Sequence, residues 1–176
     1  SDTVINFVNR YRHKDGSYRF LEWDARRNGD QVFSIARDIT NRKEREDHIT
    51  YLSYHDTLTG LFNRRFLEEE IRRLDVARNL PISVIMGDVN RLKLVNDAFG
   101  HEKGDELLIK SAEALQKSCR PEDLIARWGG DEFLIFLTKT SASDAGSIVE
   151  RIHDNCAGAA VNSIPVSISF GIGTKV

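Results

Sequence analysis

Two adjacent carboxylates, Asp131 and Glu132, lie in a short connection between two apolar segments, residues 124–128 and 133–137. Segments of this length and composition predict a β-hairpin with the carboxylates at its tip. Asp88 ends another apolar segment, and it lies beside the tip if the strands are neighbours in one sheet. Carboxylates that converge at one edge repel each other unless a cation lies between them. Oxygen ligands of this kind suit Mg²⁺.

Turn chemistry is the alternative explanation for these carboxylates. Gly129-Gly130 is a favoured hairpin turn, and Asp131 with Glu132 would then be solvated turn residues that bind nothing. Short motifs match by accident, so the tip alone does not predict a metal site.

A polar segment, residues 88–101, directly follows the buried strand predicted for residues 82–86, and we expect it to be loop and turn. Lys93 is a point charge that can meet a phosphate. Asn96 and Asp105 can hydrogen-bond to a purine edge, and a carboxylate that accepts from N1–H and the exocyclic amine selects guanine over adenine. The alternative is that Asn96 is a turn residue and that Asp105 favours the positive N-terminus of its helix.

Composition excludes several classes of protein. The 25 Lys and Arg against 27 Asp and Glu give a net charge of −2, so nucleic-acid binding through phosphate neutralisation has no support. The longest apolar run, residues 133–137, is far shorter than the roughly 18 residues of a membrane span. Cys119 and Cys156 form no disulfide framework and suit a reducing compartment. We therefore expect a cytoplasmic chain, although a longer protein could still be tethered to a membrane.

The elements that must position these residues fall into two patterns. The first 37 residues predict a three-stranded antiparallel meander, and residues 41–47 predict a helical linker whose start Asp38 or Thr40 could cap. From Asp56 onward, helical and strand segments alternate, which is typical of an α/β or α+β layer fold. Helices are predicted over 66–79, 104–119 and 144–156, and strands over 82–86, 124–128, 133–137 and 166–170.

Four blocks together resemble the GGDEF family of diguanylate cyclases. They are Gly129-Gly130-Asp131-Glu132-Phe133 preceded by Arg127-Trp128, then residues 56–65, residues 88–101, and Gly104-Asp105. The resemblance covers residues 56–176. Residues 1–40 resemble the C-terminal strands of a PAS sensory domain, and residues 41–55 would be the linker that joins it to the output domain.

This resemblance implies a fold and a reaction. The fold is α+β, an α/β sandwich in which helices flank a palm-like, mainly antiparallel central sheet. The reaction condenses two GTP molecules to cyclic di-GMP and releases two pyrophosphates, with Mg²⁺ (or Mn²⁺) as cofactor. Each domain would hold one GTP, so catalysis would require a homodimer.

The resemblance also assigns roles to individual residues. Asp88, Asp131 and the Val89 carbonyl would bind one metal, and Glu132 would bind a second metal or help to deprotonate the 3′-hydroxyl. Asn96 and Asp105 would read guanine, and Lys93 would contact phosphate. The other residues implied in GTP binding are Leu92, His101, Gly129 and Gly130.

Arg120 and Asp123 match the family's RxxD pattern, where the product binds away from the catalytic site and inhibits the enzyme. Alone, an Arg and an Asp three residues apart are surface charges of little consequence. An Arg fork can bind a phosphate or a guanine edge bidentately, which supports the inhibitory role.

The sequence departs from the family at three places, one of which is Arg91-Leu92 in place of a commonly aromatic pair. Asn90 stands where many members have a second Asp. The family also continues past a strand like residues 166–171 into a further helix and strand, so we expect a C-terminally incomplete domain. The alternative function is a non-catalytic receptor that keeps the fold and binds GTP or cyclic di-GMP. The sequence does not indicate which signal the N-terminal part senses.

Overall fold

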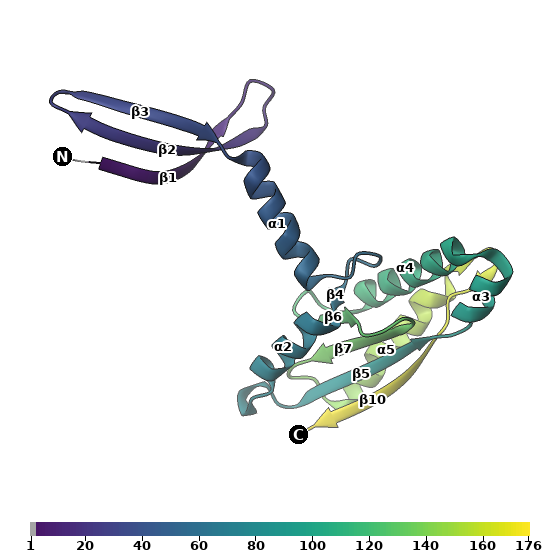
Figure 1. Cartoon of the computed structure of the whole chain (residues 1–176). Helices are drawn as coiled ribbons and strands as arrows, with labels where there is room; N and C mark the ends of the chain where they lie inside the picture. The colour runs from purple at the N-terminus through teal and green to yellow at the C-terminus, as the bar shows by residue number, and fades with distance from the viewer. Residues whose placement is uncertain (1–2) are drawn as a thin grey trace. The chain divides into compact units, whose positions relative to one another are not determined.

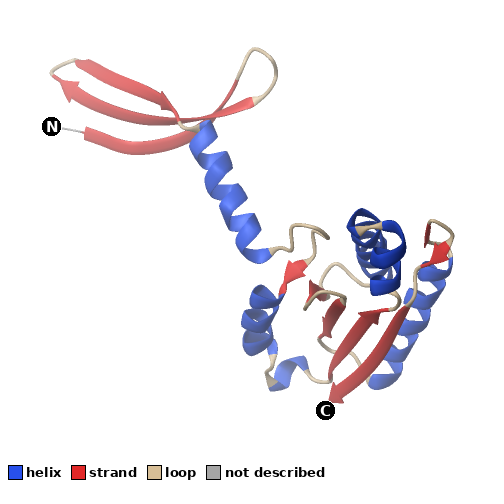
Figure 2. Ribbon diagram, turned by 45° about the vertical axis from the view of Figure 1, so that its right-hand side comes forward, coloured by secondary structure: helices blue, strands red, loops and turns tan. Residues whose placement is uncertain are grey.

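The computed structural model describes residues 3–176, which form two compact units, one ending at Tyr51 and the other comprising Leu52–Val176. The elements are β1 (Thr3–Arg12), β2 (Tyr18–Asn28), β3 (Gln31–Asp38), α1 (Thr40–Tyr54), β4 (Phe62–Asn63), α2 (Arg64–Leu74), a 3₁₀ helix (Ala77–Asn79), β5 (Ile82–Val89), α3 (Leu92–Phe99), α4 (His101–Ser118), β6 (Leu124–Arg127), β7 (Glu132–Leu137), α5 (Ala142–Ala157), β8 (Ala160–Val161), β9 (Ile164–Pro165) and β10 (Ile168–Lys175) (Figures 1 and 2). None of the helices within this described range is both long and apolar enough to cross a bilayer.

The first unit contains the antiparallel meander β1-β2-β3, as the sequence predicts. Its turns use Gly16 and Gly29 at positive φ, where glycine avoids the Cβ clash. The N–H of Thr40 donates to Asp38 Oδ1 at 2.9 Å, so Asp38 binds one of the free N–H groups at the start of α1. That this meander is part of a PAS domain stays a prediction.

A five-stranded sheet in the order β10-β5-β7-β6-β4 forms the centre of the second unit. All its pairings are antiparallel except β4 with β6. The predicted α+β fold with a mainly antiparallel sheet is therefore confirmed.

Helices cover both faces of this sheet (Figure 1). Successive strand residues point to opposite faces, so Ile85 and Val89 of β5 pack with α3, α4 and α5, while Ile82 packs on the side of Leu67 in α2. The strands β5 and β7 therefore lie in the middle of the core, and the residues at their ends have a fixed position.

The structure corrects three predicted elements. Residues 92–99 of the segment expected to be loop and turn form the helix α3, because Val95 is fully buried and Leu92 packs against the core one turn before it. The helix predicted over 66–79 ends at Leu74, whose carbonyl accepts from the Asn79 side chain at 2.8 Å. The last strand is Ile168–Lys175, which pairs with β5 over its whole length.

We predict that Ser141→Ala destabilises the second unit by about 1 kcal/mol, the usual loss for an N-cap serine. Ser141 caps α5 in a capping box, in which its Oγ accepts from the Asp144 N–H and Asp144 binds back to Ser141. Urea unfolding followed by circular dichroism measures the loss. Ser143→Ala, an exposed change in the first turn of the same helix, is the control. Equal losses in both variants would contradict the assigned cap.

Candidate active site at the hairpin tip

The register of β5 and β7 places Asp88 directly opposite Glu132. Directly opposite residues of an antiparallel pair project to the same face with their Cβ atoms about 4.5–5.5 Å apart. Asp131 precedes β7, and its carbonyl accepts from the Val89 N–H at 2.9 Å. The structure thus brings the predicted metal-binding residues together at one end of the central strands β5 and β7, which we call the carboxylate edge.

The donors at this edge fit a hard cation. Asp88 and Glu132 are exposed like charges in opposite positions, an arrangement that is unfavourable unless positive charge lies between them. Across residues 3–176, no three His, Cys, Asp or Glu side chains converge to form a metal-binding cluster. Mg²⁺ needs no such cluster, because it binds through one or two carboxylates and completes its shell with water and substrate phosphates. Two carboxylates with the Val89 carbonyl suit that chemistry.

The hairpin tip is closed by hydrogen bonds to the Glu132 carbonyl, from Trp128 N–H at 2.8 Å and Gly129 N–H at 3.3 Å. Neither Gly129 nor Gly130 is among the positive-φ glycines of the described chain. A Cβ at Gly129 would lie 2.9 Å from Glu132 Oε2, the end of a flexible, exposed side chain that would have to shift to accommodate it. The glycines of this tip are therefore not there to supply a left-handed turn conformation.

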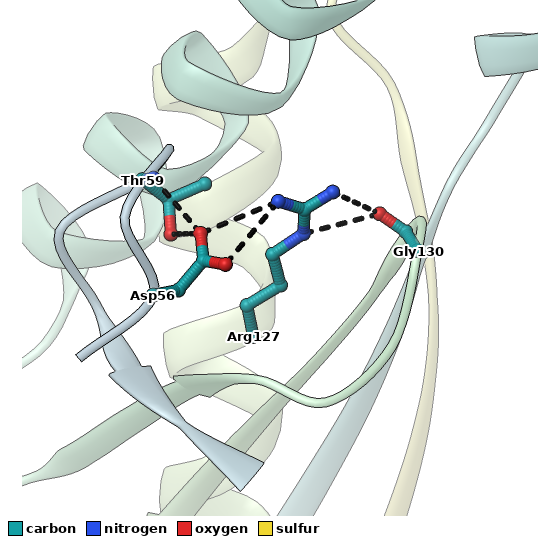
Figure 3. A network of polar contacts seen from close by, with 4 residues as sticks. All are labelled: Asp56, Thr59, Arg127 and Gly130. Atoms are coloured by element: carbon teal, nitrogen blue, oxygen red, sulfur yellow. Dashed lines mark hydrogen bonds and ion pairs between the residues drawn. The ribbon is translucent and has the colours of Figure 1, made fainter. Parts of the chain in front are cut away.

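Arg127 connects the tip to the turn that follows α1 (Figure 3). Its Nε and Nη2 donate to the Gly130 carbonyl at 3.2 and 2.7 Å, and its Nη1 contacts both oxygens of Asp56 at 3.3 and 3.4 Å. Asp56 Oδ1 also accepts from the N–H and hydroxyl of Thr59 at 2.9 and 2.7 Å. Burial raises the pKa of Asp56, but the Thr59 hydrogen bonds and the Arg127 charge outweigh it and lower that pKa.

Sequence reasoning included Asp56 and Arg127 in its motifs without giving either a role. The sequence did contain a signal for this pair, because the negative Asp56 and the positive Arg127 lie in two separate motif blocks. Their 71-residue separation hid the contact until the fold was known.

The predicted guanine-reading residues meet where α3 packs against α4. Asn96 Oδ1 is fully buried and, as far as the described residues show, has no hydrogen-bond partner. A Cβ at Gly104 would overlap this oxygen, so the glycine leaves the space that Asn96 fills. Asp105 is the next residue and is exposed. An unpaired buried acceptor is unfavourable by itself and indicates a donor that binds there.

The remaining predicted GTP contacts lie at the starts of α3 and α4. Lys93 is exposed in the first turn of α3, Leu92 is half-buried beside it, and His101 is exposed at the start of α4. Arg91, at φ 66°, turns the chain sharply from β5 into α3. The free N–H groups of α3 therefore begin next to the carboxylate edge, and such groups favour phosphate.

Arg120 and Asp123 are not part of this cluster. They lie in the loop between α4 and β6, at the opposite end of β6 from the hairpin tip. The Arg120 N–H donates to Asp123 Oδ2 at 2.8 Å. Burial raises the pKa of Asp123, and the Arg120 hydrogen bond opposes that rise only in part.

Comparison with known proteins identifies the family of the second unit. The family model described as "Diguanylate cyclase, GGDEF domain" matches residues 53–176. The chain is 34% identical to Diguanylate cyclase DgcM of Escherichia coli (strain K12) over 96% of its own length. It spans only 42% of that relative.

Solved structures show the same fold. The chain matches diguanylate cyclase SiaD of Pseudomonas aeruginosa, crystallised with its activator SiaC, with a TM-score of 0.62 and 34% identity over 76% of this chain and 54% of SiaD. It also matches the coiled coil and GGDEF domain of DgcB from Caulobacter crescentus, in complex with c-di-GMP, with a TM-score of 0.69 over 78% of each chain. At 21% identity, the DgcB match shows the fold alone.

We predict that Asp56→Asn lowers the thermal midpoint at pH 7 and that this difference shrinks only as the pH falls below about 4. A carboxyl group whose folded pKa is lowered stabilises the fold above its unfolded pKa, and this contribution is lost as the pH falls through the folded value. Differential scanning fluorimetry between pH 3 and pH 8 measures it. Asp154→Asn, an exposed change on α5, is the control. A deficit that persists unchanged in acid would show that Asp56 acts without its charge.

Proposed function

Because the chain belongs to the family of diguanylate cyclase GGDEF domains, we propose that its second unit condenses two GTP molecules to cyclic di-GMP. Each 3′-hydroxyl attacks the α-phosphorus of the opposite GTP, pyrophosphate leaves, and the hydroxyl proton is released. The observation that carries this proposal is the pairing of Asp88 with Glu132 beside Asp131. Such an edge suits a substrate that brings both a cation and phosphates.

Asp88, Asp131 and the Val89 carbonyl would hold Mg²⁺ (or Mn²⁺), with Glu132 on a second metal or near the 3′-hydroxyl. Bound there, the metal would neutralise the charge that develops on the transferring phosphoryl group. Lys93 and the free N–H groups at the start of α3 would bind the phosphates on the side away from the metal. Leu92, His101, Gly129 and Gly130 would complete the surface around the nucleotide.

Guanine would be read at the junction of α3 and α4. Asn96 Oδ1 accepts from a guanine N–H, which supplies the donor that the buried oxygen lacks in residues 3–176. Asp105 accepts from the remaining donors of the same edge. Adenine presents a different pattern of donors and acceptors, so it would leave these acceptors unpaired.

The active form would be a homodimer that its product and a sensory unit regulate. Two domains, each with one GTP, would face each other as a homodimer, because one domain carries a single hairpin edge. Cyclic di-GMP bound at Arg120 and Asp123 would inhibit the enzyme, and the meander of residues 3–38 would belong to a PAS sensor that controls it.

The direct test incubates the full chain with GTP and Mg²⁺ and analyses the products by chromatography. We expect cyclic di-GMP and pyrophosphate from the wild type, and a loss of at least about 100-fold for Asp131→Ala, the order seen when one charge-stabilising group is removed. Asp154→Ala, on the exposed face of α5, should retain the rate. Intact GTP together with nucleotide binding in calorimetry would favour the non-catalytic receptor instead.

A second test addresses base selectivity. Asn96→Ala should weaken GTP binding about tenfold to 100-fold, the effect of losing one hydrogen bond in a desolvated site. Its affinity for ATP should change little, because adenine does not use this acceptor. Calorimetry with each Mg²⁺-nucleotide measures both, and Asp97→Ala at the neighbouring exposed position is the control. An equal loss for GTP and ATP would assign Asn96 to packing.

A further inference from the structure

A row of side chains crosses the sheet at the carboxylate edge, on the face that α2 covers. Ser169 of β10 lies opposite Asp88, and Asp88 lies opposite Glu132. Trp128 continues the row, because its N–H donates to the Glu132 carbonyl at 2.8 Å and its ring packs in the apolar cluster around Leu67 of α2. Neighbouring strands lie about 4.8 Å apart, so Trp128 is one strand from Glu132 and two strands from Asp88.

Arg64 lies over the end of this row. Its Cζ is 4.6 Å from the centroid of the Trp128 ring, which is a cation–π contact. Asn63 sets this position, because it pairs with Arg127 of β6 and caps α2 by accepting from the Phe66 N–H at 2.9 Å. The helix α2 therefore begins at the carboxylate edge, with Arg64 as its first residue.

The guanidinium of Arg64 is held in place but keeps unused donors. Its Nε donates to Glu68 Oε1 at 2.7 Å, one turn further along α2. Within residues 3–176, its Nη1 and Nη2 groups donate no hydrogen bond to the protein, and 59% of the side chain is exposed. An exposed Arg–Glu pair contributes little stability by itself. The contacts with Trp128 and Glu68 instead fix the plane of a guanidinium whose outer side can bind a ligand.

The other arginine of the hairpin does not serve this face. Arg127 projects to the opposite face of the sheet, because strand residues alternate, and its guanidinium is already bound to Gly130 and Asp56. Among the described residues, the ion-pair partner of Arg64 is Glu68 and not a carboxylate of the edge. An anion that binds at the carboxylate edge therefore meets an available guanidinium on the β6 side, and that guanidinium belongs to Arg64.

We propose that Arg64, held flat against Trp128, binds the terminal phosphates of the GTP at the carboxylate edge of the same chain. This inference rests on the proposed function and adds to it a phosphate-binding residue on α2. Lys93, in the first turn of α3, is a second cation next to this edge, so the phosphates meet cations from two elements. An Arg fork can bind two phosphate oxygens at once, and its fixed plane reduces the side-chain entropy that binding costs. As pyrophosphate leaves, Arg64 stabilises the negative charge that builds on it.

The first experiment compares Arg64→Ala with Arg65→Ala in the full chain. Arg65 is the matched control, because it is the adjacent exposed arginine and forms the same kind of ion pair, with Glu69 at 3.4 Å, whereas the arginine on Trp128 is Arg64. Calorimetry uses Mg²⁺ and a GTP analogue with a methylene group between the α- and β-phosphorus, which cannot release pyrophosphate. We expect Arg64→Ala to weaken binding roughly tenfold, the scale of one hydrogen bond between charged groups. Arg65→Ala should weaken it by less than about twofold.

A shorter nucleotide shows which part of the ligand Arg64 binds. GMP lacks the two terminal phosphates, so Arg64→Ala should bind GMP with the affinity of the wild type. An equal loss for GMP and for the GTP analogue would assign Arg64 to the local structure of the edge and overturn the inference.

A double-mutant cycle tests the positioning role of the ring. Trp128→Leu should weaken binding of the GTP analogue about threefold, the scale of one exposed cation–π contact. In the Arg64→Ala background it should have no further effect, because the ring acts through Arg64. Losses that add in the double variant would overturn the role of Trp128. The comparison of Arg64→Ala with Arg65→Ala remains informative if Trp128→Leu does not fold.

Failure of this inference is distinguishable from failure of the proposed function. If the wild type converts GTP while Arg64→Ala matches Arg65→Ala in both binding and turnover, the function stands and the inference is overturned. If the wild type binds the analogue but forms no product, calorimetry alone still tests Arg64. If the wild type binds neither GTP nor the analogue, the proposed function fails and the inference fails with it.

Discussion

The antiparallel register of β5 and β7 places Asp88 directly opposite Glu132, and the arrangement of the carboxylate edge depends on this pairing. Like charges in such positions are unfavourable, yet the pair cannot separate by slipping one residue. A slip would turn Ile85 and Ile135, both fully buried, away from the core formed by α4 and α5. The core therefore holds the charges together, and a cation bound between them would relieve their repulsion.

A hairpin tip that presents carboxylates also needs a support that does not use them. Arg127 supplies it, because its guanidinium binds the Gly130 carbonyl and not the side chains of Asp131 or Glu132. Asp56 forms an ion pair with this guanidinium at 3.3 Å, and its negative charge reduces the attraction of Arg127 for the carboxylates of Asp131 and Glu132. The position of the tip thus depends on the turn after α1.

The sequence was sufficient for features whose signals are local, and insufficient for those created by tertiary contacts. The hairpin over residues 124–137 was predictable, because two apolar segments flank a short polar connection. The helix α3 was not, because it is short and two of its apolar side chains, Leu94 and Phe99, are exposed, so only the burial of Val95 and Leu92 reveals its inner face. The pairing of Asp56 with Arg127 and the unpaired oxygen of Asn96 depend on chain segments that meet only in the fold.

Asn90 shows how a departure from the family pattern can fit its surroundings. Its side-chain Nδ2 donates to Ser167 Oγ at 3.0 Å, its Oδ1 accepts from Ser169 Oγ at 3.0 Å, and its N–H donates to the Ser167 carbonyl at 2.9 Å. An ionised Asp at this position could accept but could not donate. It would also add another negative charge near Asp88, Asp131 and Glu132. The amide therefore joins the start of β10 to the end of β5 by hydrogen bonds alone, and the negative charge of this edge stays with Asp88, Asp131 and Glu132, the residues proposed to bind the metal.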